Sequence, residues 1–179
     1  MKFAIVSDSH DHVNNFTKVI NWLNQEKIKL ILHCGDICNQ ETINEAIRNF
    51  KGEIKFVRGN ADQSTQVLSA RPSTLKKCSG FNLEEIPAKQ EFAIDGKKIF
   101  FNHYPDIAKK AAESGKYDVV FYGHTHRPWE EKISSPSTGS GRVCRLVNPG
   151  ELAGQRYKPT FALYDPKTDT LSLKILELL

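Results

Sequence analysis

The 179-residue sequence has few cysteines and no long apolar run. Its cysteines, Cys34, Cys38, Cys78 and Cys144, are too few and too scattered for a disulfide framework. No apolar segment approaches the roughly 18–20 residues that a membrane span requires. The apolar run 3–6 is also shorter than the roughly seven residues of the apolar part of a signal peptide. We therefore expect a soluble, reduced, cytoplasmic protein without a membrane partner.

The chain also lacks a long run of like charge. Its net charge of +4 is mild, and the lysine doublets 76–77, 97–98 and 109–110 are well separated. This pattern is typical of solvated surfaces and is no strong signal for nucleic-acid binding. With 39% hydrophobic and 26% charged residues, the composition is that of a globular protein. Because we find no repeat and no long linker, we expect one domain over residues 1–179; a homo-oligomer stays open.

The first 65 residues alternate buried strands with helices. Val13, Phe16, Ile20 and Leu23 are spaced as on an amphipathic helix, which we expect over 12–26 with Asp11 as its N-cap. Such alternation favours a largely parallel sheet with right-handed crossovers. In this part we predict strands at 3–6, 30–32 and 54–57 and a second helix at 40–50.

Beyond residue 64 the sequence pattern is less regular. Segment 64–90 has no clear period, so we expect an irregular connection that serves as a lid, a partner surface or a plain surface loop. Asp95-Gly96 is a strong hairpin signal between strands 91–94 and 97–101. We further predict a helix at 105–115, a buried strand at 119–122, a flexible loop that forms a hairpin tip at 134–141, and strands at 161–164 and 171–176.

Polar clusters follow the predicted strands at the point where each strand ends. The carboxyl ends of strands are where loops converge on a ligand in open sheets. Taken singly, the aspartates would be helix caps or turn residues and the histidines a buried hydrogen-bonded pair. Five such clusters in a row favour a common site. They are Asp8-Ser9-His10, Gly35-Asp36, Gly59-Asn60-Ala61-Asp62, Asn102-His103 and Gly123-His124-Thr125-His126.

The side chains of these clusters are metal ligands. Carboxylate, imidazole and amide oxygen together suit Mn, Fe, Ni or Zn. Asp8 and His10 are two residues apart and point to one side of an extended backbone, and the carboxylate of Asp36 can bridge two ions. Seven candidates are too many for one tetrahedral ion and suit two ions with a shared bridge. The candidate ligands are Asp8, His10, Asp36, Asn60, His103, His124 and His126.

The order of these motifs, followed by Asn148-Pro149-Gly150, resembles the calcineurin-like metallophosphoesterase superfamily and its compact bacterial and archaeal phosphodiesterase branch. The resemblance covers residues 3 to about 150. It implies an α/β fold, a four-layer αββα sandwich of two mixed sheets, with a binuclear metal centre at one edge. It also implies that one ion is held by Asp8, His10, Asp36 and His126, and the other by Asp36, Asn60, His103 and His124.

The chain departs from the family pattern at several positions. Tyr104 stands where the family usually has Gly, and Ala61 where many members have a His that assists the leaving group. Asp62 is then a candidate for a role near substrate. Glu151 stands where the family loop normally has Ser, and its carboxylate would repel a phosphate unless it is turned away.

The expected activity is a metal-dependent phosphoesterase reaction, foremost on a small phosphodiester, with a phosphomonoester as the other possibility. Two divalent ions, Mn foremost with Ni, Fe or Zn as alternatives, would bridge a hydroxide that attacks phosphorus in line. Asn60 and Arg127 would neutralise charge on the phosphate, and His12 is a further candidate to face substrate. The alternative is a non-catalytic scaffold of the same fold, like the retromer subunit of eukaryotes that resembles this branch.

Overall fold

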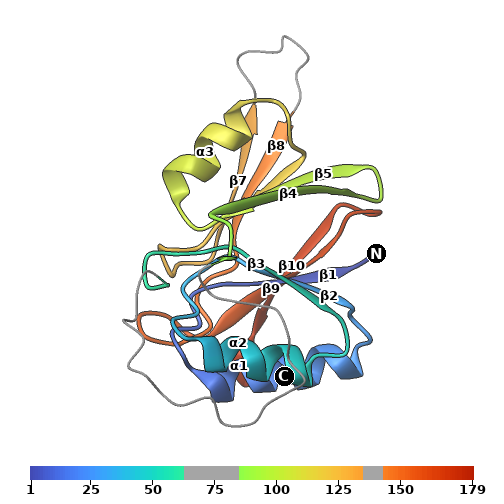
Figure 1. Cartoon of the computed structure of the whole chain (residues 1–179). Helices are drawn as coiled ribbons and strands as arrows, with labels where there is room; N and C mark the ends of the chain where they lie inside the picture. Colours follow the sequence, from blue (N-terminus) through green and yellow to red (C-terminus); the bar gives the residue numbers. More distant parts are fainter. Residues whose placement is uncertain (63–84, 135–142) are drawn as a thin grey trace.

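The computed structural model describes residues 1–62, 85–134 and 143–179 (Figure 1). Most of the irregular segment expected at 64–90, and most of the loop expected at 134–141, lie outside these ranges. Within them, the chain forms two five-stranded sheets and three α-helices. No helix in the described ranges is both long and apolar enough to cross a membrane.

The first sheet contains the three strands of the predicted parallel unit. β1 (Phe3–Val6), β2 (Leu30–His33) and β3 (Glu53–Phe56) pair in parallel. β9 (Thr160–Asp165) and β10 (Thr170–Ile175) extend the sheet on the other side of β1 and pair antiparallel. The strand order is β10-β9-β1-β2-β3, so the sheet is mixed.

The second sheet is mixed in the same way. β5 (Lys97–Asn102), β6 (Val119–Phe121) and β8 (Val143–Asn148) are parallel neighbours. β4 (Lys89–Ile94) and β7 (Trp129–Ser134) pair antiparallel at the two edges. The sequence analysis marked the loop between β7 and β8 without predicting either strand.

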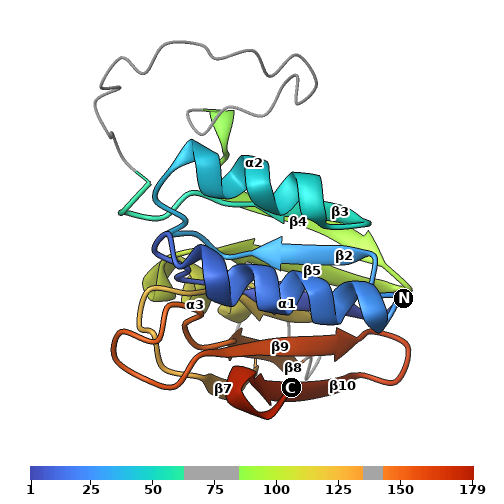
Figure 2. The ribbon, with the colours of Figure 1, turned by 90° about the horizontal axis from the view of Figure 1, so that it is seen from below.

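The helices cover the outer faces of the two sheets (Figures 1 and 2). α1 (Val13–Gln25) and α2 (Gln40–Asn49) lie on the first sheet, and α3 (Pro105–Glu113) lies on the second. A short 3-10 helix, η2 (Leu176–Leu178), ends the chain near α1. The predicted four-layer αββα sandwich of two mixed sheets is confirmed.

The buried apolar residues follow these layers. Alternate residues of β1 face opposite sides: Ala4 and Val6 pack under the helices, while Phe3 and Ile5 pack between the sheets. β6 does the same, because Phe121 joins the layer between the sheets and Val120 packs toward α3. Strands that bury both faces read as continuous apolar runs, which is why the sequence revealed them.

The start of α1 differs from the prediction. The N-cap is His12, whose Nδ1 accepts the backbone N–H of Asn15 at 3.3 Å. The carboxylate of Asp11 instead accepts hydrogen bonds from the backbone N–H of Asn39 and the hydroxyl of Thr42 at the start of α2. Asp11 therefore ties the two helices together, because a partner from α2 satisfies the carboxylate that would otherwise cap α1.

Candidate metal centre

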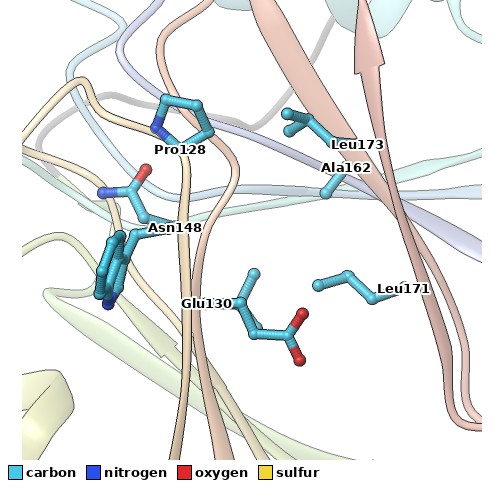
Figure 3. A pocket seen from close by; sticks show the side chains of 8 residues that line it. Pro128, Glu130, Asn148, Ala162, Leu171 and Leu173 are labelled. Carbon is cyan, nitrogen blue, oxygen red and sulfur yellow. The ribbon is translucent and has the colours of Figure 1, made fainter.

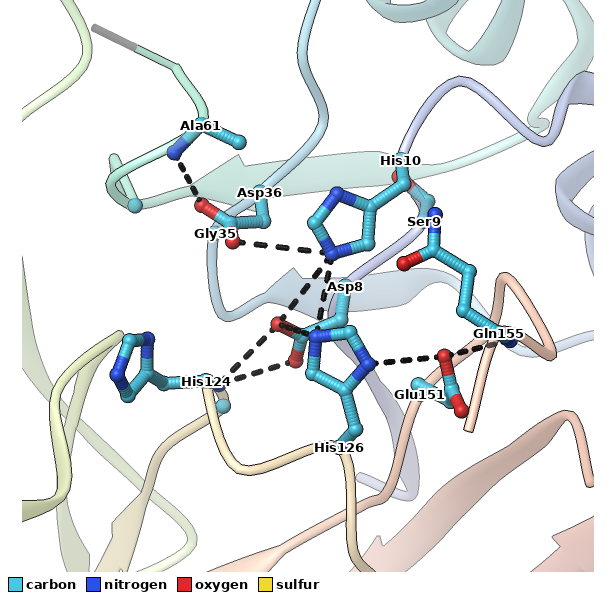
Figure 4. Close-up of polar contacts among 12 residues, drawn as sticks. Asp8, Ser9, His10, Gly35, Asp36, Ala61, His124, His126, Glu151 and Gln155 are labelled. Atoms are coloured by element: carbon cyan, nitrogen blue, oxygen red, sulfur yellow. Dashed lines mark hydrogen bonds and ion pairs between the residues drawn. The ribbon is translucent and has the colours of Figure 1, made fainter. Parts of the chain in front are cut away.

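The candidate ligands all lie in loops that leave the carboxyl ends of strands. Asp8 and His10 follow β1, and Asp36 follows β2. Asn60 follows β3 closely in the sequence, His103 directly follows β5, and the His124–His126 loop follows β6. Because the two sheets pack face to face, the loops of both meet at one edge of the sandwich, and Figure 4 shows Asp8 and His10 of the first sheet beside His126 of the second.

One group of side chains surrounds a point between His10 and His126. The Nε2 atoms of these two histidines lie 3.2 Å apart. The Oδ1 atom of Asp8 is 3.4 Å from His126 Nε2, and the Oδ2 atom of Asp36 is 3.8 Å from His10 Nε2. Two imidazole nitrogens and two carboxylate oxygens that converge in this way form a donor set for one divalent cation.

A second group lies on the other side of Asp36. The Oδ2 atom of Asp36 is 3.4 Å from His103 Nε2, and the same nitrogen lies 3.1 Å from Asn60 Oδ1. His124 Nδ1 completes the group at 2.9 Å from the same Asn60 oxygen. Asp36 thus contacts both groups through one carboxylate oxygen, as a bridge between two ions would.

Unusual backbone conformations are concentrated in these loops. Five of the seven candidate ligands have positive φ, between 40° and 70°. Such values cost side-chain-bearing residues roughly 1 kcal/mol or more each and persist only where the surroundings impose them. Here the loops brace each other, since the backbone N–H of Asp8 donates to Gly35 O and that of His10 to Asp36 O, both at 3.0 Å. These five ligands are Asp8, His10, Asp36, His124 and His126.

Two glycines of the motifs are explained by close approach. A Cβ atom on Gly59 would lie 2.1 Å from Asp36 Oδ1, and one on Gly123 would lie 1.9 Å from Ser7 Oγ. No real Cβ makes contacts this short. The Gly-Asn and Gly-His pairs therefore have glycine because the neighbouring loop passes directly against its backbone.

Asp62, expected near substrate, is buried beneath the loops. Its carboxylate accepts four backbone N–H hydrogen bonds of 2.8–2.9 Å, from Gly59 and from the turn Asp36–Cys38. The side chain thereby fixes the loop after β2 against the loop after β3. This placement supports a role in positioning Asp36.

The carboxylates of the centre are buried and partly neutralised by histidine. Burial raises the pKa of Asp8 to about 7. For Asp36, burial also acts to raise the pKa, but the hydrogen bond and charge of His103 outweigh it and leave the pKa lowered. Burial acts to lower the pKa of His103, and Asp36 reverses this and raises it. A divalent cation would replace the protons that now balance this charge, so the residues fit a metal centre.

The other predicted site residues, Arg127 and His12, are exposed. The guanidinium of Arg127 lies over the ring of Trp129, 5.3 Å from its centroid, and Trp129 is half exposed. His12 serves as the cap of α1. His33 is buried, with Nε2 3.1 Å from Ser9 Oγ. Cys34 and Cys38, expected as reduced thiols, are free cysteines.

The residues that contact Glu151 could not be predicted from the sequence. Its side chain is fully buried and turned away from the open side of the centre, so it does not present the repulsive charge considered above. The carboxylate lies 3.0 Å from His126 Nδ1 and also accepts the backbone N–H groups of residues 155–157. The only signal in the sequence was the departure from the family loop.

Arg156 lies in the segment that Glu151 holds. Burial lowers the pKa of His124 and of His126, and the positive charge of Arg156 adds to both effects. Its guanidinium makes no ion pair with any residue of the described ranges. It is therefore a second cationic candidate for a phosphate contact, beside Arg127.

A pocket of about 240 Å³ opens between the two sheets (Figure 3). Its wall combines β7 and β8 of one sheet with β9 and β10 of the other. None of the candidate ligands lines it, so the metal centre is outside this pocket. The lining residues are Pro128, Trp129, Glu130, Val147, Asn148, Ala162, Leu171 and Leu173.

Comparisons with known proteins agree with this architecture. The calcineurin-like phosphoesterase superfamily domain matches residues 1–169. A phosphodiesterase of Methanocaldococcus jannaschii is 32% identical over 99% of this chain and 100% of its own length. The chain belongs to the calcineurin-like phosphoesterase superfamily and is a hydrolase of that family.

Solved structures extend the comparison. The structure of an archaeal phosphodiesterase superposes with a TM-score of 0.76 at 29% identity, covering 98% of this chain and 99% of the other. Vps29 of Entamoeba histolytica, solved in complex with Zn²⁺, has a TM-score of 0.64 at 17% identity, covering 97% and 96%. This second likeness shows the fold alone.

Proposed function

We propose that the protein is a metal-dependent phosphodiesterase with a binuclear centre. The observation that carries the proposal is the position of Asp36, whose Oδ2 atom lies 3.8 Å from His10 and 3.4 Å from His103. One carboxylate between two groups of nitrogen and oxygen donors is the arrangement that a bridged pair of cations requires. The similar phosphodiesterase of M. jannaschii supports the same reaction class.

The two ligand sets follow from the two groups of side chains. We assign Asp8, His10, Asp36 and His126 to one ion, and Asp36, Asn60, His103 and His124 to the other. The mixture of imidazole, carboxylate and amide favours Mn²⁺, with Ni²⁺, Fe²⁺ and Zn²⁺ as alternatives. When bound, such ions supply a hydroxide nucleophile at neutral pH and neutralise the phosphate oxygens.

Residues of the chain would orient the substrate. Asn60 directs Oδ1 toward His103 and His124, so its amide N–H group is available to a phosphate oxygen. Arg127 and Arg156 are the candidates for a charge-assisted contact with the phosphate. We favour Arg156, because Arg127 is stacked on Trp129. His12 is a further candidate to face substrate, and its Nδ1 atom already accepts the backbone N–H of Asn15 as the cap of α1.

The leaving group would depart with little help from the protein. Ala61 occupies the place where many superfamily members have an assisting histidine. Without a general acid, an alkoxide that is already stable leaves faster. We therefore expect aryl phosphodiesters to be cleaved much faster than alkyl phosphodiesters.

Hydrolysis assays test this proposal. The metal-stripped protein receives Mn²⁺, and hydrolysis of bis(p-nitrophenyl) phosphate is compared with that of a dialkyl phosphate. We expect turnover that a chelator abolishes, a preference for the aryl diester, and a loss of at least about 100-fold in Asp36→Asn, the bridge variant. The exposed variant Asp106→Asn is the control. Turnover that survives chelation refutes the metal-dependent mechanism, and equal rates on both diesters refute the absence of a general acid.

The non-catalytic scaffold considered above receives no support from the centre. All seven candidate ligand positions keep side chains that bind metal, and they converge in space. A scaffold would not need this set.

A further inference from the structure

The carboxylate of Glu151 is fully partnered beside the centre. Oε1 accepts the backbone N–H of Arg156 at 2.6 Å and of Tyr157 at 2.5 Å. Oε2 accepts the backbone N–H of Gln155 at 2.9 Å and lies 3.0 Å from Nδ1 of His126, as Figure 4 shows. The side chain is 0% exposed. Burying a charge this deeply is costly unless every acceptor is used, and here both oxygens are.

The partners of Glu151 determine where His126 carries its proton. Both carboxylate oxygens already act as acceptors toward backbone N–H groups, so the contact with His126 is made by an imidazole N–H. A neutral imidazole with hydrogen on Nδ1 has its lone pair on Nε2. That atom faces Asp8 Oδ1 at 3.4 Å and His10 Nε2 at 3.2 Å, on the side of the metal centre.

His103 makes the same kind of hydrogen bond through Nδ1, with a different acceptor. Its Nδ1 lies 2.8 Å from the carbonyl oxygen of Cys34, which can only accept, and its Nε2 faces Asp36. The two buried histidines of the centre thus share one orientation. The difference is that the acceptor behind His126 is a charged side chain that also holds a loop.

We infer that Glu151 is a positioning residue, which fixes the tautomer and direction of the His126 ring for metal binding and ties that ring to the 155–157 segment. The inference rests on the proposed metal centre. It gives a role to the residue by which this chain departs from the usual family loop. Through the backbone of Arg156, the same carboxylate places a cation beside the site.

Glu151→Gln is the sharpest variant, because it keeps the size and changes only one end of the contact. The new amide nitrogen can only donate. If it takes the Oε2 position and faces His126, hydrogen moves from Nδ1 to Nε2, where it blocks the metal. If it takes the Oε1 position, the backbone N–H groups of Arg156 and Tyr157 lose their acceptor. We expect the affinity for Mn²⁺ alone, measured by calorimetric titration of metal-stripped protein, to fall by about 10- to 100-fold. Glu53→Gln, an exposed strand position, is the matched control.

A double-mutant cycle separates positioning from folding. In a His126→Ala background, Glu151→Gln should leave the remaining Mn²⁺ affinity unchanged. Equal losses in both backgrounds would show that Glu151 acts only through the loop, and would overturn the inference. Thermal unfolding of each variant, followed by circular dichroism, verifies that the compared proteins are folded.

Imidazole ¹⁵N spectra of the metal-free protein give an independent readout. Wild type should show His126 with hydrogen on Nδ1, and Glu151→Gln should shift it toward Nε2. A wild-type protein that carries the hydrogen of His126 on Nε2 overturns the inference. Wild type that binds none of Mn²⁺, Ni²⁺, Fe²⁺ and Zn²⁺ would refute the proposed function, whereas the spectra would still decide what Glu151 does to His126.

Discussion

At the scale of single residues, the centre is built at the expense of stability. Asp8 is fully buried, and burial raises its pKa to about 7. Between pH 4 and 7 the unfolded chain has lost this proton while the folded, metal-free protein keeps it. The free energy of unfolding therefore falls as pH rises through this window, by at most about 1.4 kcal/mol per pH unit.

Asp8→Asn removes this titration. With a chelator present, we expect the variant to be more stable than wild type at pH 8 and about equally stable at pH 4, as measured by urea unfolding. Saturating Mn²⁺ should reverse the order, because a bound ion stabilises only the protein that holds it tightly. Asp106→Asn, at an exposed position, should show neither effect. A stability difference between Asp8→Asn and wild type that is the same at both pH values contradicts the prediction.

At the scale of elements, Asp62 joins the ends of β2 and β3. Its carboxylate satisfies four backbone N–H groups in two loops, and one of these groups belongs to Asp36. Asp62→Ala leaves these donors without partners, so we expect a loss of about 3–5 kcal/mol in the free energy of unfolding. Calorimetric titration should also show weaker Mn²⁺ binding, because the Asp36 loop is released.

Asp62→Asn distinguishes this role from direct action on substrate. The amide keeps one acceptor, so the variant should lose part of the stability and part of the Mn²⁺ affinity together. If it lowered kcat while the unfolding free energy and Mn²⁺ affinity stayed at wild-type values, Asp62 would act on substrate, as first expected from the sequence.

At the scale of the whole molecule, the two sheets share one apolar layer. Phe3 of β1 lies 6.0 Å from Phe121 of β6 and 5.6 Å from Tyr164 of β9, measured between ring centroids. Because neither sheet can bury this face without the other, we propose that residues 1–179 unfold as one unit. Circular dichroism in the far and near ultraviolet should report coincident transitions.

Phe121→Ala tests the shared layer from the side of the second sheet. We expect a loss of about 3–5 kcal/mol with a single transition preserved. Two separated transitions, or a loss confined to one probe, would show that the sheets fold independently. Leu178→Ala, at a largely exposed position, serves as the comparison.

Much of the fold and of the candidate site could be predicted from local pattern. Buried strands were visible as apolar runs, and five of the predicted strands were followed by polar residues of ligand type. Patterns also misled where a residue had a distant partner. Asp11 has the chemistry of an N-cap, yet α2 engages its carboxylate and His12 caps α1. β7 is largely exposed and has only one buried residue, Ile133, so its sequence contains no apolar run from which the strand could be predicted.

The sequence by itself determined the alternation of strands and helices, the positions of the seven candidate ligands and the superfamily, because these depend on residue type and short spacing. Only the tertiary structure decided which candidate ligands lie together, that Asp36 lies between the two groups, and that Glu151 is turned inward. His126 and Glu151 are 25 residues apart, and His10 and His126 are 116 apart. Their contacts arise when two sheets pack face to face, and no local period in a chain encodes which loops that packing brings together.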